Sequence, residues 1–247
     1  MKPMIELEDL TKQFDRTRAV DHLTLTIPEG EIFGFIGPNG AGKTTTIRMM
    51  GGLLLPTSGD IRIDGLSVLD DPVGVKRRIG FIPDRPYLYE KLTGMEYMRF
   101  IADLYDASQP PFQEKAEQLL RVFSLFRWRH ELIESYSHGM KQRLIIAAAL
   151  LHDPKVVIVD EPMVGLDPAA VKMVKDLFRD LAATGKTLFM STHTLSVAEN
   201  LCDRIGIIDR GKIIALGTVD ELKQTANLRE GDLEEVFIRL TEPEAWT

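Results

Sequence analysis

The segment 37–44 constrains this chain most, because it fixes both a local fold and a kind of ligand. It reads Gly-Pro-Asn-Gly-Ala-Gly-Lys-Thr and matches the phosphate-binding pattern G-x-x-x-x-G-K-[ST]. The apolar stretch 31–36 before it is typical of a buried parallel strand, and 43–50 predicts a helix that ends at Gly51 and Gly52. A chance match in a glycine-rich turn would not place a strand and a helix on the correct sides. The sequence therefore predicts a nucleoside triphosphate site.

Each position of this loop has a physical role. Glycines let backbone N–H groups line a concavity for the β- and γ-phosphates, and the helix N-terminus adds the positive end of its dipole. We expect Lys43 to place its charge on the phosphates, both for binding and for catalysis, and the Thr44 hydroxyl to ligate Mg²⁺. The nucleotide-binding residues predicted here are Gly37, Pro38, Asn39, Gly40, Ala41, Gly42, Lys43, Thr44 and Thr45.

Length and composition narrow the class of protein. A chain of 247 residues can bury a substantial core as one domain, or as one domain with a subdomain. The 30 Lys and Arg against 37 Asp and Glu give a net charge of −7, so the totals imply no face for nucleic acid and we expect no such partner, although they leave a local basic patch open. The longest apolar run, 144–151, is much shorter than the ~20 residues that span a bilayer. The first residues lack a secretory apolar core, and the single Cys202 fits a reducing cytoplasm, which is the location we expect.

The first 153 residues predict strands followed by a helical block. Strand-like stretches occur at 4–10, 19–20, 23–27, 61–65 and 79–83. From about Pro86 to Asp153 the pattern becomes helical: residues 93–96 form a capping box, Pro110 and Pro111 open a second helix, and a third runs from about Gly139 to Leu151. We interpret this block as a helical subdomain, about 86–153, inserted into an α/β core.

Strands return after this block. Buried-strand runs at 156–159 and 187–191 flank a helix from Pro168 to about Ala183, and 205–208 and 212–215 predict a hairpin. Residues 218–221 cap a short helix. The last stretch is acidic and carries Leu233, Val236, Phe237 and Leu240 at helical spacing. We expect one domain over 1–225 and an acidic helical tail over 226–247.

Two acidic residues follow the strand 156–159. Ligands bind at the carboxyl ends of parallel strands, so Asp160 is placed to reach a metal ion. Glu161 follows it and is expected to act as the general base or to position the attacking water. A solvated strand end would also explain an isolated Asp-Glu pair, but not its occurrence behind a phosphate-binding loop.

A further loop at the start of a helix, 136–143, reads Tyr-Ser-His-Gly-Met-Lys-Gln-Arg. By itself it could be an ordinary serine N-cap or an anion site. Together with the preceding motifs, it makes the chain resemble the ATP-binding subunit of an ATP-binding-cassette (ABC) transporter over nearly its whole length. The family's signature at this loop is usually Leu-Ser-Gly-Gly-Gln: Ser137 and Gly139 match it, whereas Tyr136, His138 and Met140 depart from it.

The resemblance assigns three further residues. Phe14 matches the aromatic ring that stacks on adenine, although a core position would fit the sequence nearly as well. Asp167 matches the D-loop aspartate and is also an N-cap followed by Pro168. His193 matches the switch histidine, which in the family contacts the γ-phosphate and orients the attacking water.

Asp84 is the clearest departure from the family. Most members carry Gln at this position, which helps hold Mg²⁺ and water. A carboxylate can still ligate Mg²⁺, so Asp84 joins Thr44 and Asp160 as a predicted metal ligand. It would also crowd negative charge near Asp160 and Glu161, and the sequence leaves open whether it weakens turnover or simply replaces Gln.

The resemblance implies an α/β P-loop NTPase fold of the ABC-cassette type: a mixed-sheet core, an N-terminal antiparallel β subdomain and an inserted helical subdomain. It implies a head-to-tail dimer that holds two ATP molecules with Mg²⁺ between its protomers; we expect a homodimer, although the sequence does not distinguish it from a heterodimer. Dimer closure on ATP binding would drive separate transmembrane permease subunits from the inner face of the cell membrane. The permease contact would lie near 84–90 and the helix that starts at Thr93, where Leu88, Tyr89 and Tyr97 are either apolar contacts or subdomain core.

Alternative functions differ in what the ATPase drives. The stretch 232–241 and the variant signature resemble exporter subunits. A soluble ABC-type ATPase acting on ribosomes or DNA without transport is the second candidate, but such proteins usually carry two cassettes, long insertions or basic arms. A non-hydrolysing ATP switch is disfavoured by Glu161 and His193.

Overall fold

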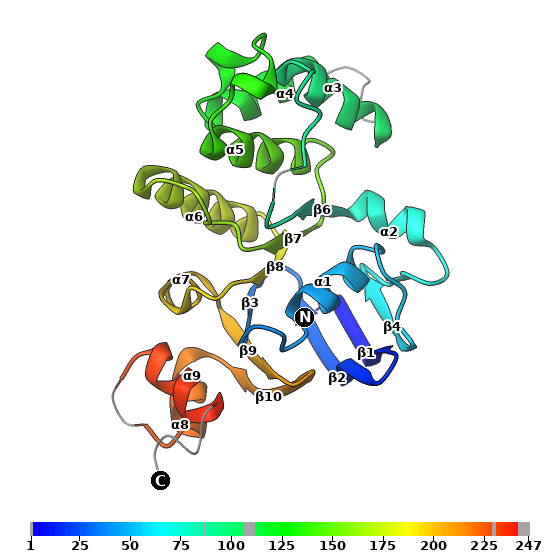
Figure 1. Ribbon diagram of the computed structural model, residues 1–247, viewed down its shortest axis with the longest axis vertical. Helices are drawn as coiled ribbons and strands as arrows, with labels where there is room; N and C mark the ends of the chain where they lie inside the picture. Colours follow the sequence, from blue (N-terminus) through cyan, green and yellow to red (C-terminus); the bar gives the residue numbers. More distant parts are fainter. Residues whose placement is uncertain (1, 86, 106–111, 229–230, 242–247) are drawn as a thin grey trace.

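A computed structural model describes residues 2–85, 87–105, 112–228 and 231–241 (Figure 1). Its N-terminal strands form a four-stranded antiparallel sheet in the order β2-β1-β4-β5. The strands are β1 (Pro3–Phe14), β2 (Thr17–Pro28), β4 (Ser58–Ile63) and β5 (Leu66–Ser67). The stretches 19–20 and 23–27, predicted separately, belong to the one strand β2, because β1 and β2 stay paired through several shifts of register.

A six-stranded sheet carries the site. It consists of β3 (Ile32–Ile36), β6 (Ile79–Ile82), β7 (Val156–Asp160), β8 (Thr187–Ser191), β9 (Arg204–Asp209) and β10 (Lys212–Gly217), in the order β10-β9-β3-β8-β7-β6. All its strand pairs are parallel except the β9–β10 hairpin. Every residue of β3, β7 and β8 is buried, as expected for parallel strands covered on both faces. The predicted mixed sheet is confirmed.

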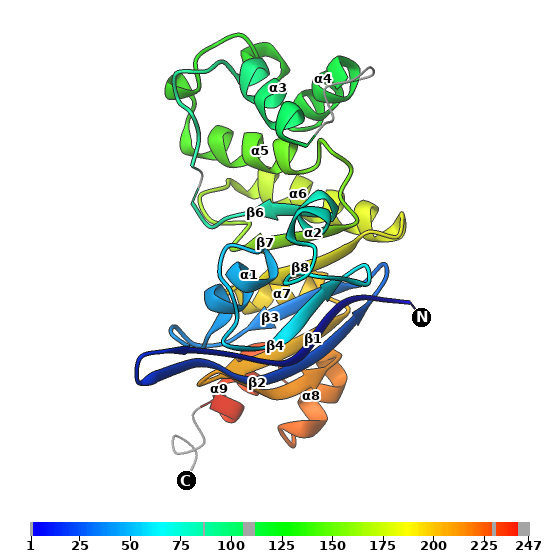
Figure 2. The same ribbon diagram turned by 90° about the vertical axis from the view of Figure 1, so that its right-hand side faces the viewer.

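The helix that follows the phosphate-binding loop lies between the two sheets. This helix, α1 (Lys43–Met50), buries Ile47, Met49 and Met50 in an apolar cluster with residues of β1, β2 and β4 on one side and of β3, β7 and β8 on the other. Figure 2 looks onto β1, β2 and β4, with the larger sheet behind them. The packing fixes the start of α1, and therefore the loop, against the carboxyl ends of the parallel strands.

Residues 94–105 and 112–149 form a block of helices, drawn in green in Figure 1. It contains α3 (Gly94–Leu104), α4 (Phe112–Val122), α5 (His138–Ala149) and the 3₁₀ turns η1 (Phe126–Trp128) and η2 (Ile133–Ser135). The capping box of Thr93 and Glu96 is confirmed, with both of its hydrogen bonds present. The predicted helix start at Pro110 and Pro111 lies outside the described residues. Helix α5 begins one residue earlier than predicted, since Ser137 is its N-cap.

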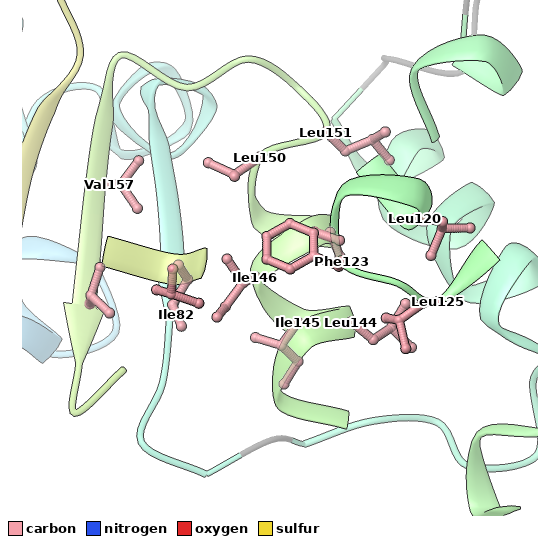
Figure 3. Close-up of a cluster of buried hydrophobic side chains, with 14 of the residues drawn as sticks. Ile82, Leu120, Phe123, Leu125, Leu144, Ile145, Ile146, Leu150, Leu151 and Val157 are labelled. Atoms are coloured by element: carbon pink, nitrogen blue, oxygen red, sulfur yellow. The ribbon is translucent and has the colours of Figure 1, made fainter. Parts of the chain in front are cut away.

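The core of the helical block continues into the larger sheet. Figure 3 shows Leu120, Phe123 and Leu144 of the helical block on one side of this core, and Ile82 and Val157 of the sheet on the other. Side chains of α5, including Ile145, Ile146 and Leu150 at its end, lie between them (Figure 3). Because one apolar cluster spans both parts, burial holds α5 against the strand that leads to Asp84.

The remaining helices are α2 (Pro72–Arg78), α6 (Pro168–Ala183), α7 (Leu195–Leu201), α8 (Val219–Thr225) and α9 (Leu233–Thr241). Helices α2 and α7 were not predicted, because each has only seven residues and depends on packing rather than on a long periodic pattern. Helix α9, red in Figure 1, packs against α7 and α8. It buries Leu233 and Val236, while Phe237 and Leu240 are partly buried beside them. None of the helices in the described ranges is long and apolar enough to cross a membrane.

Candidate nucleotide-binding site

A cavity of about 320 Å³ lies at the carboxyl edge of the larger sheet, where the phosphate-binding loop meets the ends of β6, β7 and β8. Its lining residues are Ala19, Asn39, Gly40, Gly42, Lys43, Thr44, Thr45, Asp84, Asp160, Glu161, Ser191 and His193. The structure thus brings together the loop, the Asp160–Glu161 pair, Asp84 and His193, although they are up to about 150 residues apart in the sequence.

The loop keeps its shape because two of its glycines leave no room for a side chain. Gly42 has φ 112°, and a Cβ there would overlap the carbonyl of Ala19. A Cβ on Gly37 would overlap the carbonyl of Ile208 in β9. Gly42 is the N-cap of α1 and no side chain caps this helix, so its first turn, which lines the cavity, is left as an anion-binding surface.

Lys43 is buried in this loop and points back at it. Its Nζ donates hydrogen bonds to the carbonyl oxygens of Gly37, at 2.6 Å, and Pro38, at 3.1 Å. Burial lowers the pKa of Lys43, while the nearby carboxylates of Glu161 and Asp160 act in the opposite direction. A phosphate oxygen would be a stronger partner for this ammonium than two neutral carbonyls.

Asp160 ends β7 and is 6% exposed. Burial raises the pKa of Asp160, and the negative charges of Asp84 and Glu161 raise it further. A divalent cation would relieve this repulsion. No group of three or more His, Cys, Asp or Glu among the described residues forms a metal site by itself. The donors that line the cavity, namely Thr44, Asp84 and Asp160, suit Mg²⁺, which usually takes few protein ligands and adds phosphate oxygens and waters.

Glu161 is held on three sides. Its Oε1 lies 2.7 Å from Nδ1 of His193, and its Oε2 accepts a hydrogen bond from Oγ1 of Thr192 at 3.2 Å. Its backbone N–H donates a hydrogen bond to the carbonyl oxygen of Ser191 at 3.0 Å. Its φ of 52° lies in the left-handed region, which costs a non-glycine residue conformational energy. Strain of this kind persists where the surrounding contacts over-determine the geometry, as they do in active sites.

The signature-like loop lies outside this cavity. Ser137 caps α5 by accepting a hydrogen bond from the N–H of Met140 at 3.3 Å. Gly139 lies beside Gly165, and the ring of His138 packs against Gly165, where a Cβ would overlap it. The predicted D-loop residue Asp167 caps α6 through the N–H of Ala170, at 2.8 Å. None of these residues lines the cavity.

Four other predicted nucleotide-binding residues, Phe14, Gly37, Pro38 and Ala41, do not line the nucleotide cavity. Phe14 ends β1 and is 46% exposed, with Nζ of Lys12 5.1 Å from its ring centre, so a core position for Phe14 is wrong. Ala41 is buried within the loop, while Gly37 and Pro38 line a second cavity behind it.

Three residues around the site were not predicted as site residues. Ala19 comes from β2 and had no sequence signal, because only the packing of β2 beside the loop places it there. Ser191 is the last residue of β8, and Thr192 stands between it and His193. Their place at the carboxyl end of a buried strand, directly before His193, could have identified them from the sequence.

Comparison with known proteins agrees with this geometry. Residues 20–164, more than half of the chain, match the family model described as ABC transporter. The chain is 42% identical over 221 residues to the daunorubicin/doxorubicin resistance ATP-binding protein DrrA of Streptomyces peucetius, covering 90% of this chain and 67% of that protein.

Two solved structures are similar over most of the chain. One, described as the structure of the ATP-binding subunit of an ABC transporter, has a TM-score of 0.91 and 35% identity, covering 96% of this chain and 99% of that one. The other is a dimeric post-hydrolysis state of the ATP-binding cassette MJ0796 bound to ADP and Pi, with a TM-score of 0.80 and 28% identity, covering 87% of this chain and 98% of that one. The chain therefore belongs to the ABC transporter family, as an ATP-binding cassette of the P-loop α/β fold.

Proposed function

We propose that this chain is the ATP-hydrolysing subunit that drives a separate transmembrane permease of an ABC exporter. The observation that carries the proposal is the contact of Glu161 with His193 in the cavity that also contains Lys43, Thr44 and Asp160. Membership in the family supports ATP hydrolysis coupled to transport. The similarity to DrrA, which is named for daunorubicin/doxorubicin resistance, supports export.

Binding begins with an exchange of partners at Lys43. Its ammonium leaves the carbonyls of Gly37 and Pro38 for the β- and γ-phosphates, while the N–H groups at the start of α1 bind the same phosphates. Thr44 and Asp160, with Asp84 directly or through water, would hold Mg²⁺. When bound, Mg²⁺ would neutralise part of the charge on the phosphates and on the three cavity carboxylates.

Glu161 and His193 act on the attacking water. Glu161 accepts its proton or fixes its direction, and Thr192 keeps the carboxylate in place by holding Oε2. Nδ1 of His193 is engaged by Glu161, so Nε2 is the ring nitrogen left to contact the γ-phosphate. Lys43 stabilises the negative charge that remains on the phosphates.

The second half of each site comes from another copy of the chain. Ser137 and Gly139 do not line the cavity of their own protomer, which supports a head-to-tail homodimer in which they close on the γ-phosphate of the partner's ATP. The dimeric MJ0796 structure supports such an assembly. Asp167 would lie at the dimer interface, and the exposed Phe14 would stack on the adenine of its own protomer's ATP.

The permease would dock beside the segment after β6. Two cavities of about 130 Å³ and 250 Å³ adjoin there and share Phe81 and Tyr105. Tyr87 is 82% exposed at the rim, whereas Tyr97 is 7% exposed and packs in the core beneath it. We therefore assign the contact to the exposed aromatic residues and not to Tyr97. An apolar cytoplasmic segment of the permease fits this surface and would keep the cassette at the inner face of the membrane.

The proposed division of the chain follows from these roles. Residues 1–225 would form the ATP-binding domain, and 226–247 would be an appended tail. The helical insertion at about 86–153 would carry the permease contact and also the loop with Ser137 and Gly139, which acts on the ATP of the other protomer. Action on ribosomes or DNA remains the alternative, and the net charge of −7 gives it no support.

Substitution of Glu161 tests hydrolysis. Glu161→Gln should lower ATP turnover by about 10²–10⁴-fold, because the amide cannot accept the proton of water. ATP binding should survive, and an ATP-dependent dimer should accumulate in size-exclusion chromatography. Glu234→Gln, on the exposed face of α9, is the matched control and should turn over normally. Unchanged turnover in Glu161→Gln would refute the proposed mechanism.

Copurification tests the coupling to transport. The native protein should be recovered from membranes together with a polytopic membrane protein, and Tyr87→Asp should weaken this recovery without changing basal ATP turnover. Recovery with ribosomes or DNA in place of a membrane protein would support the alternative function.

A further inference from the structure

A second cavity, of about 210 Å³, lies behind His193. It is lined by Gly37, Pro38, Asn39, Thr192, His193, Leu195 and Phe237. Asn39 and His193 also line the nucleotide cavity, so the imidazole stands between two open spaces. The predicted catalytic roles do not use this second cavity, nor do they use Phe237.

Phe237 reaches this cavity from the C-terminal helix α9. Helix α9 packs on α7, and α7 begins at Leu195, two residues after His193. Phe237 itself is partly buried in the apolar cluster that α9 shares with α7 and α8. The C-terminal helix therefore forms one wall of the space directly behind the switch histidine, and none of its described residues lines the nucleotide cavity.

His193 has little else to hold it. Its side chain is 64% exposed, and the contact that directs it toward the nucleotide is the one from Nδ1 to Oε1 of Glu161. A histidine side chain moves between staggered rotamers at small energetic cost when no neighbour blocks the alternatives. The second cavity is open space beside the ring into which it could turn, and Phe237 is one of the walls that bound this space.

We propose that Phe237 is a positioning residue for His193: as a wall of the cavity behind the imidazole, it limits movement of the ring away from Glu161 and so keeps the ring in line with the γ-phosphate. The proposal rests on the role of His193 in ATP hydrolysis stated above. Helix α9 would then influence ATP hydrolysis without contacting the nucleotide. A displacement of this helix would free the His193 ring to move and would leave nucleotide binding unchanged.

Kinetics of ATP hydrolysis by the full chain test this role. Phe237→Ala should lower kcat about fivefold to tenfold and leave KM for ATP within about twofold, because the lost interaction acts on the transition state and not on binding. The kcat of Phe237→Leu should lie between that of the wild type and that of Phe237→Ala. Leu240→Ala is the matched control, since Leu240 packs in the same cluster from the same helix but does not line the cavity. It should lose similar thermal stability and keep kcat within about twofold.

The position of the ring gives an independent readout. In protein labelled with ¹³C at histidine Cε1, the His193 resonance is assigned by its absence in His193→Gln. Phe237→Ala should shift this resonance, and Leu240→Ala should not. If Phe237→Ala leaves both kcat and the resonance unchanged, or if both alanine variants lower kcat equally, the proposal is overturned. If His193→Gln itself retains full turnover, the proposed function of His193 is what fails.

Discussion

Nδ1 of His193 lies 2.7 Å from Oε1 of Glu161, although the two residues follow the ends of different strands. The contact is possible because β7 and β8 are parallel neighbours in register, with Asp160 opposite Ser191. The loop residues that follow each strand therefore leave the sheet at the same edge. The side chains that we propose as the base for water and as the contact to the γ-phosphate are therefore held next to each other by the sheet.

Thr192 should be needed for the direction of the Glu161 carboxylate. Thr192→Val keeps the volume of this buried side chain but removes its hydrogen bond to Oε2. We expect kcat for ATP to fall about tenfold with KM unchanged, because a misdirected base slows only the chemical step. Steady-state phosphate release measures both. Thr192→Ser retains the hydroxyl and should be within about twofold of wild type; equal loss in both variants would contradict this role.

Asp84→Gln should retain ATP hydrolysis within about tenfold, because an amide oxygen can still hold Mg²⁺ directly or through water. The change also removes one of the charges that raise the pKa of Asp160, so activity should persist to lower pH than in wild type. A pH profile of ATP turnover at saturating Mg²⁺ measures this. Asp84→Ala removes the ligand altogether and serves as the comparison. Near-complete loss in Asp84→Gln would mean that the carboxylate has a dedicated role.

The packing of His138 on Gly165 should couple the two loops energetically. Gly165 has φ 76°, and a Cβ there would overlap the ring of His138. Gly165→Ala should therefore lower the free energy of unfolding by more than Gly185→Ala, whose φ is 88° but whose Cβ would meet nothing closer than Oε1 of Glu29 at 3.6 Å. Adding His138→Gly to Gly165→Ala should recover about 1 kcal/mol relative to the sum of the single effects. Urea unfolding measures all four variants, and additive effects would argue against the contact.

His152 should make stability depend on pH. Its ring stacks on Tyr105, with centroids 3.8 Å apart, and its Nε2 donates to the carbonyl oxygen of Ile79 at 3.0 Å. Burial lowers the pKa of His152 from 6.5 to about 4. Between these values the unfolded chain binds a proton that the folded chain does not, so the free energy of unfolding decreases as pH falls from 6.5 toward 4.

His152→Gln should remove this part of the pH dependence, while lowering stability at pH 7 because the ring stack is lost. Urea unfolding at several pH values between 7 and 4 measures both effects. His130→Gln changes an exposed histidine and should follow the wild-type profile. A wild-type slope preserved in His152→Gln would show that other groups cause it.

Much of the local structure could be predicted because its interactions lie within a few residues. The phosphate-binding loop with its strand and helix, the capping box of Thr93 and Glu96, and the hairpin turn at Arg210 and Gly211 all depend on backbone geometry and neighbouring side chains. The acidic pair at the end of β7 could be named because it follows a strongly apolar run, whereas the histidine after β8 was assigned by the family resemblance.

The sequence alone determined which residues can bind phosphate, ligate a metal ion and activate water, since residue type and local spacing decide those capacities. Only the tertiary structure decided which of them meet. Strand order brings Asp84, Asp160 and His193 to one edge. Packing of α9 places Phe237 behind His193. These outcomes depend on burial summed over residues far apart in the chain, which no local pattern encodes.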